Sequence, residues 1–388
     1  MAYKITLDPQ DVEKLDMRNI DTTKPNNSYD SPDIQQFTNK EVSIEDLLIW
    51  CSTTDCSDLY IKEWNQPYIS RFGKIVRIPC LPTTRNVWMQ FYNLYVKEEL
   101  NAKYVREKML DTSTEIRIPE NNPYYGKYDT KYFRYRTSLG FSENDKIATF
   151  RMIRPEDPTF DTINYPDECK EALKKAYNEK TGIIFFTGPT GSGKTTTLAA
   201  VMNTFTRPGE ILDNKVFITL EDPIEYTFHS TDSVKFSQKE LDKDFLSYAS
   251  GIKQALREHP NCVNVGEARD REVIQAAIEA ARTGHLVSTS FHAGDVGGTI
   301  SRLLFHLDNN KDLSYDLILN LNIIMSQKLL KQDDRYLVDT QYMLFTDEIR
   351  EHLLGIINNE KNVQFEINKL VKNPKLQEMK VVKDWSYE

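Results

Sequence analysis

Three glycines, a lysine and a threonine stand in the spacing G-x-x-x-x-G-K-[ST] near the middle of the chain. Gly188, Gly191 and Gly193 would let the backbone turn its N–H groups toward a phosphate. At this spacing the Lys194 ammonium can reach the β and γ phosphates of a nucleotide, and the Thr195 hydroxyl can hold Mg²⁺. The spacing therefore predicts a nucleotide site. Its predicted binding residues are Gly188, Pro189, Thr190, Gly191, Ser192, Gly193, Lys194, Thr195 and Thr196.

The residues around this loop predict a doubly wound α/β sheet. Residues 183–187 form an apolar, β-branched and aromatic run, which is typical of a strand buried on both faces. The helix predicted after the loop would place its positive end at the phosphate, and the ligand would lie at the carboxyl ends of the strands. The other predicted elements are strands at 216–220, 262–265, 286–290 and 336–345, a helix at 271–283 that Gly284 ends, and mostly helical sequence from Leu313 onward.

Three further polar stretches lie at the ends of predicted strands and could complete a hydrolytic site. Glu221 and Asp222 leave one strand together, and Glu267 ends another in the manner of an acid that orders Mg²⁺ through water. His285 precedes a third strand and His292 follows it. The residue types leave other interpretations open, because a Glu-Asp pair is more often a solvated acidic turn and a single histidine is more often structural.

The sequence before the loop predicts a polar arm, an α+β domain and a linker. Residues 1–42 are rich in Asn, Asp, Ser and Pro, which is typical of an extended arm. Residues 43–154 alternate between helical and strand patterns, so we expect helices on one face of a mainly antiparallel sheet. Prolines mark a linker or hinge at 155–166, which leaves 167–388 to the second domain. The predicted elements of the first domain are a helix at 44–51 capped by Ser43, strands at 58–61, 68–72, 74–78, 132–139 and 146–153, a hairpin at Gly73, and a helix at 87–107.

Composition restricts the class of protein further. The 388 residues carry a net charge of -9, which argues against a surface built for nucleic-acid phosphates. The five cysteines contain no C-x-x-C pair, so we expect buried thiols in a reducing compartment and no structural zinc site. No apolar run approaches the roughly 18 residues of a membrane span, so we expect a cytosolic chain.

Four stretches resemble, in this order, the Walker A, Asp box, Walker B and His box of the secretion ATPase superfamily, which includes type II secretion and type IV pilus motors. They are residues 182–200, 218–226, 262–270 and 283–293. The C-S-D-L-Y-I segment at 56–61 is similar to the A-S-D-I-H-L opening of the family's PAS-like N-terminal domain. Further similar segments are 111–116, 133–136 and 150–153 at the end of that domain and 346–351 in the C-terminal element of retraction motors.

Within the superfamily, the chain resembles the DotB and TraJ branch of type IVB secretion and IncI-type conjugation, with PilT-like retraction motors next. The polar arm, the size and the loop lengths carry this resemblance, and the tetracysteine insertion of assembly and type II secretion motors is absent from the sequence. The departures from the family pattern are modest. Asn264 lies in the normally apolar Walker B strand and needs a hydrogen-bond partner if it is buried. The other departures are Ala268, Ser290 and Phe291.

The resemblance implies a PAS-like domain followed by a RecA-like P-loop ATPase domain that binds ATP and Mg²⁺ in a homohexamer. It assigns Glu221 as the general base that positions water, Glu267 as the acid that supports Mg²⁺ together with Thr195, and His292 as a γ-phosphate sensor. The candidates to reach a phosphate from the N-terminal domain, possibly across a subunit boundary, are Arg134, Arg136 and Arg151, with Arg269 and Arg282 as weaker ones.

The sequence therefore predicts a hexameric motor ATPase, recruited from the cytoplasm to an inner-membrane secretion, conjugation or pilus complex. Two alternatives stay open: an ATP-binding assembly or scaffold protein with little turnover, and a pilus retraction motor. A nucleic-acid translocase on the same core is disfavoured by the acidic balance, so nucleic acid is not expected as a direct ligand.

Overall fold

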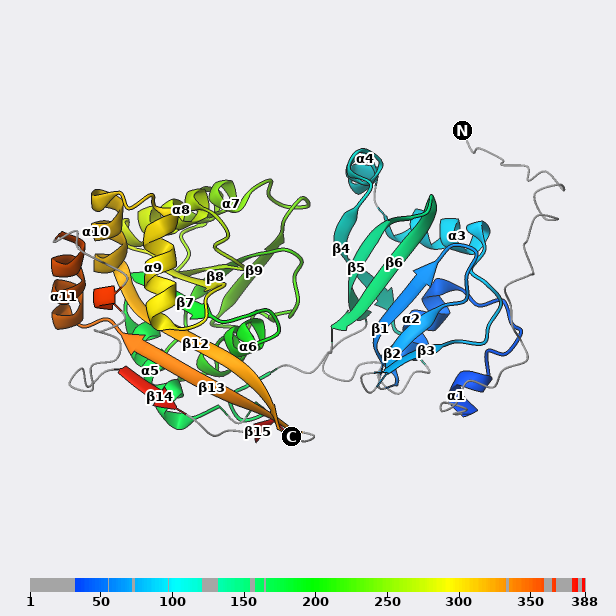
Figure 1. Cartoon of the computed structure of the whole chain (residues 1–388), viewed down its shortest axis with the longest axis horizontal. Coiled ribbons are helices and arrows are strands. Elements are labelled where there is room, and N and C mark those ends of the chain that lie inside the picture. The colour runs from blue at the N-terminus through cyan, green and yellow to red at the C-terminus, as the bar shows by residue number, and fades with distance from the viewer. Residues whose placement is uncertain are drawn as a thin grey trace.

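The chain builds two β-sheets that lie side by side in a computed structural model (Figure 1). One sheet comes from the N-terminal domain and the other from the C-terminal domain, which the sequence predicts to be an ATPase domain. The structure describes residues 32–54, 56–71, 74–96, 98–120, 132–153, 158–163, 165–332, 335–358, 365–367, 379–382 and 386–387. The predicted hairpin at Gly73 and the arm up to residue 31 lie outside these residues.

The N-terminal sheet is antiparallel throughout and has the strand order β3-β2-β1-β6-β5-β4. Alternate residues of β4 and β5 are buried, because one face of the sheet packs against helices. This confirms the predicted α+β fold. The strands are β1 (Cys56–Lys62), β2 (Tyr68–Arg71), β3 (Lys74–Arg77), β4 (Leu110–Arg117), β5 (Tyr132–Ser142) and β6 (Asp145–Ile153), and the helices are α1 (Pro32–Gln35), α2 (Ile44–Ser52), α3 (Arg85–Tyr95) and α4 (Glu98–Glu107).

The second sheet is mainly parallel and has the order β14-β13-β12-β7-β11-β10-β8-β9, with β15 paired to β13. Every pair from β12 through β9 is parallel, whereas β13 pairs antiparallel with β12, β14 and β15. This confirms the predicted α/β fold. The strands are β7 (Gly182–Thr187), β8 (Val216–Glu221), β9 (Lys235–Glu240), β10 (Cys262–Val265), β11 (Leu286–Phe291), β12 (Leu321–Gln332), β13 (Arg335–Leu344), β14 (Met379–Val382) and β15 (Ser386–Tyr387).

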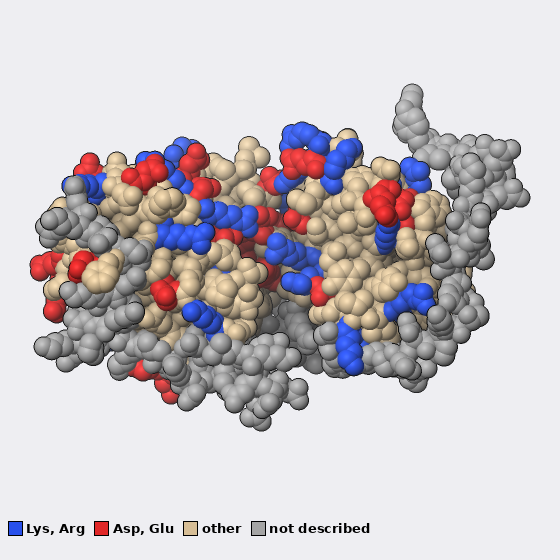
Figure 2. Space-filling view, in the orientation of Figure 1, with Lys and Arg blue, Asp and Glu red and all other residues tan. Residues whose placement is uncertain are grey.

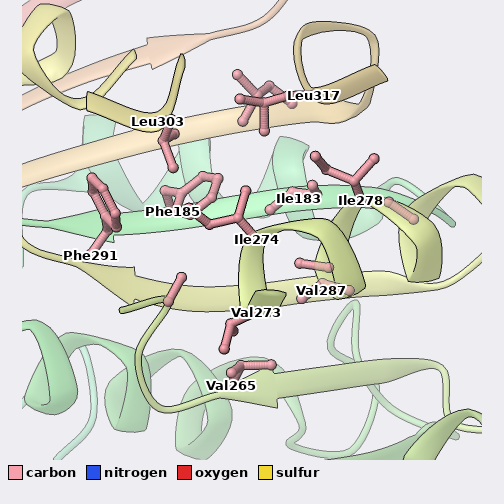
Figure 3. Close-up of a cluster of buried hydrophobic side chains, with 14 of the residues drawn as sticks. Ile183, Phe185, Val265, Val273, Ile274, Ile278, Val287, Phe291, Leu303 and Leu317 are labelled. Atoms are coloured by element: carbon pink, nitrogen blue, oxygen red, sulfur yellow. The ribbon is translucent and has the colours of Figure 1, made fainter. Parts of the chain in front are cut away.

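Helices cover both faces of the parallel strands. On one face, side chains of the sheet and of three helices point toward one another, as Figure 3 shows for Phe185, Ile274 and Leu303. On the other face, α5 and α6 pack against Ile184 and Phe186. Burial on both faces explains the uninterrupted apolar sequence of β7. The helices of this part are α5 (Asp167–Asn178), α6 (Lys194–Phe205), α7 (Tyr248–Ala255), the 3₁₀ helix η4 (Leu256–Glu258), α8 (Arg271–Arg282), α9 (Val296–His306), α10 (Lys311–Asn320) and α11 (Asp347–Asn358).

Local signals placed several elements correctly. Ser43 caps α2 as predicted, since its hydroxyl oxygen accepts a hydrogen bond of 3.0 Å from the Asp46 N–H. Gly284 follows α8 with φ = 96°, a left-handed conformation that favours glycine. Among the described residues no helix combines the length and the apolar character that crossing a membrane requires.

Four segments differ from the sequence prediction. The single helix expected at 87–107 is two helices, because Val96 is extended and ends α3. β12 replaces part of the expected helical C-terminal sequence, since Ile323, Ile324 and Met325 are fully buried in a parallel pair with β7. β9 was not predicted, because it contains a single apolar residue, Phe236, and forms a half-buried edge strand. β4 was not predicted either, although it pairs with β5 along its whole length. For the three strands, pairing with neighbouring strands outweighs local propensity.

Parts of the predicted arm and linker belong to the two cores. Ile34 of α1 is buried in the N-terminal core, and Asp33 forms a 2.9 Å ion pair with Arg71. Phe160 and Tyr165 are buried among residues of the ATPase domain. The linker therefore contributes packing to the ATPase domain from Phe160 onward, and the exact domain boundaries stay a prediction.

We expect Phe160→Ala to destabilise the ATPase domain by about 3–5 kcal/mol, because it removes a fully buried ring that packs against Phe205. Urea unfolding of the whole chain measures the effect. The matched control is Phe305→Ala, since the Phe305 side chain is exposed. Equal stability of the two variants would show that the linker segment does not pack on the domain.

Candidate functional site

The loop between β7 and α6 has the geometry of a phosphate cradle. Gly193 adopts φ = 82° directly before α6, so the helix begins at the loop and its first N–H groups have no intrahelical partner and can bind an anion. A Cβ atom at Gly188 would come within 2.2 Å of the Gln327 carbonyl oxygen, so only glycine fits there. The predicted loop residues thus follow the strand and precede the helix, as the spacing requires.

Gln327 of β12 contacts the phosphate loop, and the sequence analysis did not identify it. Its Nε2 donates to the Ser192 carbonyl oxygen at 2.6 Å, and its Oε1 accepts from the Thr197 hydroxyl at 3.0 Å. The side chain is 1% exposed. Gln327 therefore ties the loop to the first turn of α6 through a neighbouring strand. A glutamine inside an apolar run was the only sequence signal for it.

Lys194 lies over its own loop. Its Nζ donates to the carbonyl oxygens of Gly188 and Pro189, at 2.9 Å each. Burial lowers the pKa of Lys194, and the negative charges of Glu267 and Glu225 oppose that shift. The ammonium is thus held beside the cradle by neutral carbonyls, which it can exchange for phosphate oxygens.

Glu221, the last residue of β8, is a buried carboxylate that hydrogen-bonds mainly through one oxygen. Its Oε1 accepts from the Thr219 hydroxyl at 2.6 Å and from Gln238 Nε2 at 3.1 Å, whereas from the described residues its Oε2 accepts only a long bond of 3.4 Å, from the Glu225 N–H. Burial raises the pKa of Glu221, and these donors oppose the shift. Asp222 follows it and lies 3.5 Å from Arg269. Burial also raises the pKa of Asp222.

Glu267 and His292 meet as the order of the strands predicts. His292 Nε2 lies 3.0 Å from Glu267 Oε1, and Arg269 Nε donates to Glu267 Oε2 at 2.6 Å. Arg302 donates to the His292 carbonyl oxygen at 2.6 Å, which fixes the loop after β11. Arg269, a weaker candidate from sequence, is therefore part of the site and bridges Glu267 and Asp222.

The three arginines of the N-terminal domain differ in their surroundings. Arg134 is mostly buried, and it donates to the Thr227 hydroxyl at 2.8 Å and pairs with Glu115 at 3.2 Å. Arg136 is 45% exposed and lies 3.9 Å from Glu225. Arg151 is 69% exposed and pairs with Asp58 at 2.8 Å. Two of the three thus contact the loop after Glu221 within the same chain.

Two other candidates lie away from the nucleotide edge. His285 precedes β11, at the opposite end of the strand from His292, and its Nδ1 lies 3.4 Å from the Thr283 hydroxyl. Arg282 ends α8 and pairs with Asp316 at 2.7 Å. Both contacts are structural. Asn264 has the partner that its burial requires, because its Oδ1 accepts a 3.3 Å hydrogen bond from Ser288.

The cysteines form no disulfide in the structure, and each one is buried. No group of three His, Cys, Asp or Glu side chains within the described part of the chain is arranged to hold a metal ion. The site is therefore built from a phosphate loop and single acids.

Among the described residues, hydrogen bonds and ion pairs join the two domains beside this site. The Ser113 hydroxyl of β4 donates to Glu240 Oε2 at 2.8 Å and accepts from Lys243 Nζ at 2.9 Å, and Lys103 pairs with Asp242. Figure 2 shows Lys, Arg, Asp and Glu side chains gathered where the two domains meet. Glu240 is the register partner of Glu221 on the neighbouring strand.

A glycine loop after a central parallel strand, with acids ending two neighbouring strands, defines a P-loop ATPase. A family model described as "Type II/IV secretion system protein" matches residues 94–353. The chain belongs to this family, in agreement with the resemblance of its four motifs.

Individual relatives agree with this family. The "Type IV pilus retractation ATPase PilT" of Pseudomonas aeruginosa is 29% identical over 299 residues, which are 75% of this chain and 79% of the relative. The structure of the ATPase DotB of Legionella pneumophila matches with a TM-score of 0.73 at 28% identity, over 89% of this chain and 91% of DotB. The pilus retraction motor PilT with bound ADP matches with a TM-score of 0.70 at 26% identity, over 85% and 89%.

We expect Gln327→Met to weaken nucleotide binding roughly ten-fold, since it keeps the side-chain length but removes both hydrogen bonds to the loop region. Titration with a fluorescent ADP analogue measures the affinity. Gln254→Met, on the exposed face of α7, is the control. Unchanged affinity in Gln327→Met would mean that the loop keeps its shape without this contact.

Proposed function

We propose that this chain hydrolyses ATP and converts the reaction into movement of its N-terminal domain relative to its ATPase domain. The observation that carries the proposal is the buried Glu221 carboxylate at the same sheet edge as the phosphate loop, with one oxygen hydrogen-bonded and the other nearly free. Such a group can accept a proton from water that attacks the γ phosphate.

The raised pKa of Glu221 suits this role. A carboxylate whose pKa lies above its ordinary value binds a proton more strongly, so its ionised form is a stronger general base. Thr219 and Gln238 stabilise the ionised form and orient it. The nearly free Oε2 is the atom that would accept the proton.

The residues present fit Mg²⁺ as the metal that accompanies the nucleotide. Thr195 is exposed at the start of α6 and offers a hydroxyl oxygen, and the Glu267 charge reaches the neighbouring Lys194. Mg²⁺ prefers such oxygen ligands and otherwise retains water and phosphate oxygens, so one hydroxyl and one outer carboxylate suffice. When bound, Mg²⁺ would neutralise charge that develops on the phosphates.

His292 is suited to sense the γ phosphate. Its Nε2 faces Glu267 at 3.0 Å, and its imidazole is 39% exposed, so it can exchange this partner for a phosphate oxygen. Loss of the γ phosphate would return the ring to Glu267. His292 would thereby link the nucleotide state to the Glu267–Arg269–Asp222 contacts.

We further propose a homohexamer in which an N-terminal arginine reaches the nucleotide of a neighbouring subunit. Arg136 and Arg151 are the better placed candidates, because much of each side chain is exposed, whereas Arg134 is mostly buried between two partners. An arginine that approaches the γ phosphate would favour a closed arrangement of domains, which hydrolysis would release.

The family supports a role at an inner-membrane machine, to which the motor would be recruited from the cytoplasm. Similarity to DotB favours a type IVB secretion or conjugation complex, and similarity to PilT supports a pilus retraction motor as the second candidate. The remaining alternative is a scaffold protein that binds ATP with little turnover. Steady-state turnover, measured with and without membrane partners, distinguishes this scaffold from a motor.

Glu221→Gln should bind ATP with unchanged affinity and hydrolyse it roughly 10²-fold more slowly, because the amide cannot accept the proton from water. Lys194→Ala should lose nucleotide binding or turnover, since it removes the ammonium beside the loop. Steady-state phosphate release and nucleotide titration measure the two effects.

Glu351→Gln is the control for both, because it removes an exposed carboxylate on α11. Wild-type turnover in Glu221→Gln would assign the base to another acid. Wild-type turnover in Lys194→Ala would contradict the nucleotide site itself.

Mixing two inactive variants tests the arginine in trans. Subunits carrying Arg136→Ala or Arg151→Ala should recover turnover when mixed with Lys194→Ala subunits, because each mixed interface can pair an intact loop with an intact arginine. Phosphate release from mixed and unmixed samples gives the comparison. Absence of recovery for both arginines, in samples where native mass spectrometry detects mixed oligomers, would contradict an arginine in trans.

A further inference from the structure

Gln238 of β9 lies at the centre of a hydrogen-bond network that joins Glu221 to the loop after it. Its Nε2 donates to Glu221 Oε1 at 3.1 Å and to the Tyr226 carbonyl oxygen at 2.8 Å, and its Oε1 accepts from the Phe228 N–H at 2.7 Å. One amide therefore contacts the predicted general base and two backbone groups of the loop that follows it.

The orientation of this amide is determined by its surroundings. The Phe228 N–H can only donate, so the oxygen of Gln238 must face it. The nitrogen then faces two acceptors, the Tyr226 carbonyl and the Glu221 carboxylate. A reversed amide would place its oxygen against both acceptors and lose all three bonds.

Strand register places Gln238 beside the second donor to Glu221. β8 and β9 pair in parallel with Thr219 opposite Gln238 and Glu221 opposite Glu240. Thr219 and Gln238 thus stand on one face of the sheet and donate to the same carboxylate oxygen, Oε1. This leaves Oε2 with its one long contact to the Glu225 N–H.

The loop that Gln238 contacts is also the loop that the N-terminal domain contacts. Thr227 accepts a 2.8 Å hydrogen bond from Arg134, and Glu225 lies 3.9 Å from Arg136. On the other side, the Tyr226 hydroxyl lies 3.1 Å from the Thr196 hydroxyl, next to the phosphate loop. A displacement of the N-terminal domain would therefore pull on backbone groups that share the Gln238 amide with Glu221.

We propose that Gln238 is a positioning residue that orients the Glu221 carboxylate and makes its orientation depend on where the N-terminal domain holds residues 224–228. The inference rests on the proposed hydrolysis and deepens it by naming a route from domain position to the base.

The route is physically direct. If the loop moves away, the Gln238 amide must follow Tyr226 and Phe228 or leave them unpaired, and either outcome weakens its bond to Glu221. Glu221 then loses the donor that orients it and stabilises its ionised form. The position of the N-terminal domain therefore controls whether Glu221 is oriented to accept a proton. The charged and titratable groups around Glu221 are Glu225 of its own loop, Glu240 beside it on β9, Tyr248 of α7 and the neighbouring Asp222, and Arg269 lies beyond Asp222.

Gln238→Met tests the positioning role, because methionine has a similar length and cannot donate. Loss of one donor to the ionised carboxylate raises the pKa of Glu221 further, so the acidic limb of the kcat profile should move to higher pH by roughly one unit. KM for ATP and the affinity for ADP should stay unchanged, since Gln238 contacts the Glu221 carboxylate and is not part of the phosphate loop.

Lys239→Met is the matched control. Lys239 is the next residue of the same strand, points to the opposite face and pairs with Glu258, so its loss should leave the pH profile unchanged. An unshifted limb in Gln238→Met would overturn the positioning role. If Gln238→Met does not fold, Gln238→Asn withdraws the amide by one methylene and should shift the limb in the same direction.

A double-mutant cycle tests the dependence on the domain. Thr227→Val removes the acceptor for Arg134 and leaves Gln238 in place, and it should lower kcat several-fold in the wild-type chain. In the Gln238→Met background the same change should have no effect, because the route is already interrupted. Additive effects of the two substitutions would overturn the coupling.

The outcome also separates this inference from the proposed function. If Glu221→Gln keeps wild-type turnover, another acid is the base, and the role of Glu221 in the proposed function fails together with the inference about Gln238. If Glu221→Gln is slow while Gln238→Met keeps the wild-type profile, only the inference about Gln238 fails.

Discussion

The shape of the phosphate loop depends on a contact with a strand that lies far from it in sequence. Gln327 reaches from β12 to the loop at Ser192 and to the first helical turn at Thr197. Gly188 has no room for a side chain because the Gln327 carbonyl oxygen lies against it. The shape of the phosphate loop therefore depends on the pairing of β12 with β7 as well as on the glycines and the lysine of the loop itself.

A second constraint acts on Glu221, where burial and hydrogen bonding oppose each other. Burial disfavours the charged carboxylate, and the donors Thr219 and Gln238 favour it. A base needs both effects, since burial alone would protonate it and donors alone would make it too weak to accept a proton. The balance is set by two neighbouring strands, β8 and β9, whose register brings the donors to one oxygen.

Sequence reasoning found what local spacing encodes. The loop, the strands that carry Glu221 and Glu267, and the cap at Ser43 each have a signal within a few residues. It missed Gln238 and Gln327, because both act across strand pairs and the sequence gives no register between distant strands. β9 escaped prediction for the same reason: an edge strand of polar residues looks like a loop until its partner is known. The contacts of Arg134 with Thr227 and of Arg136 with Glu225 likewise depend on how the two domains meet.

The polar contacts between the domains have a thermodynamic consequence. The three hydrophobic clusters stay within single domains, and the described contacts that join the domains are hydrogen bonds and ion pairs such as Lys103–Asp242 and Ser113–Glu240. The proposed movement would not divide any of these clusters, so it would expose few of their side chains to water and would change the heat capacity little. The equilibrium between domain arrangements would then vary little with temperature through hydration and strongly with ionic strength, because salt screens the pairs.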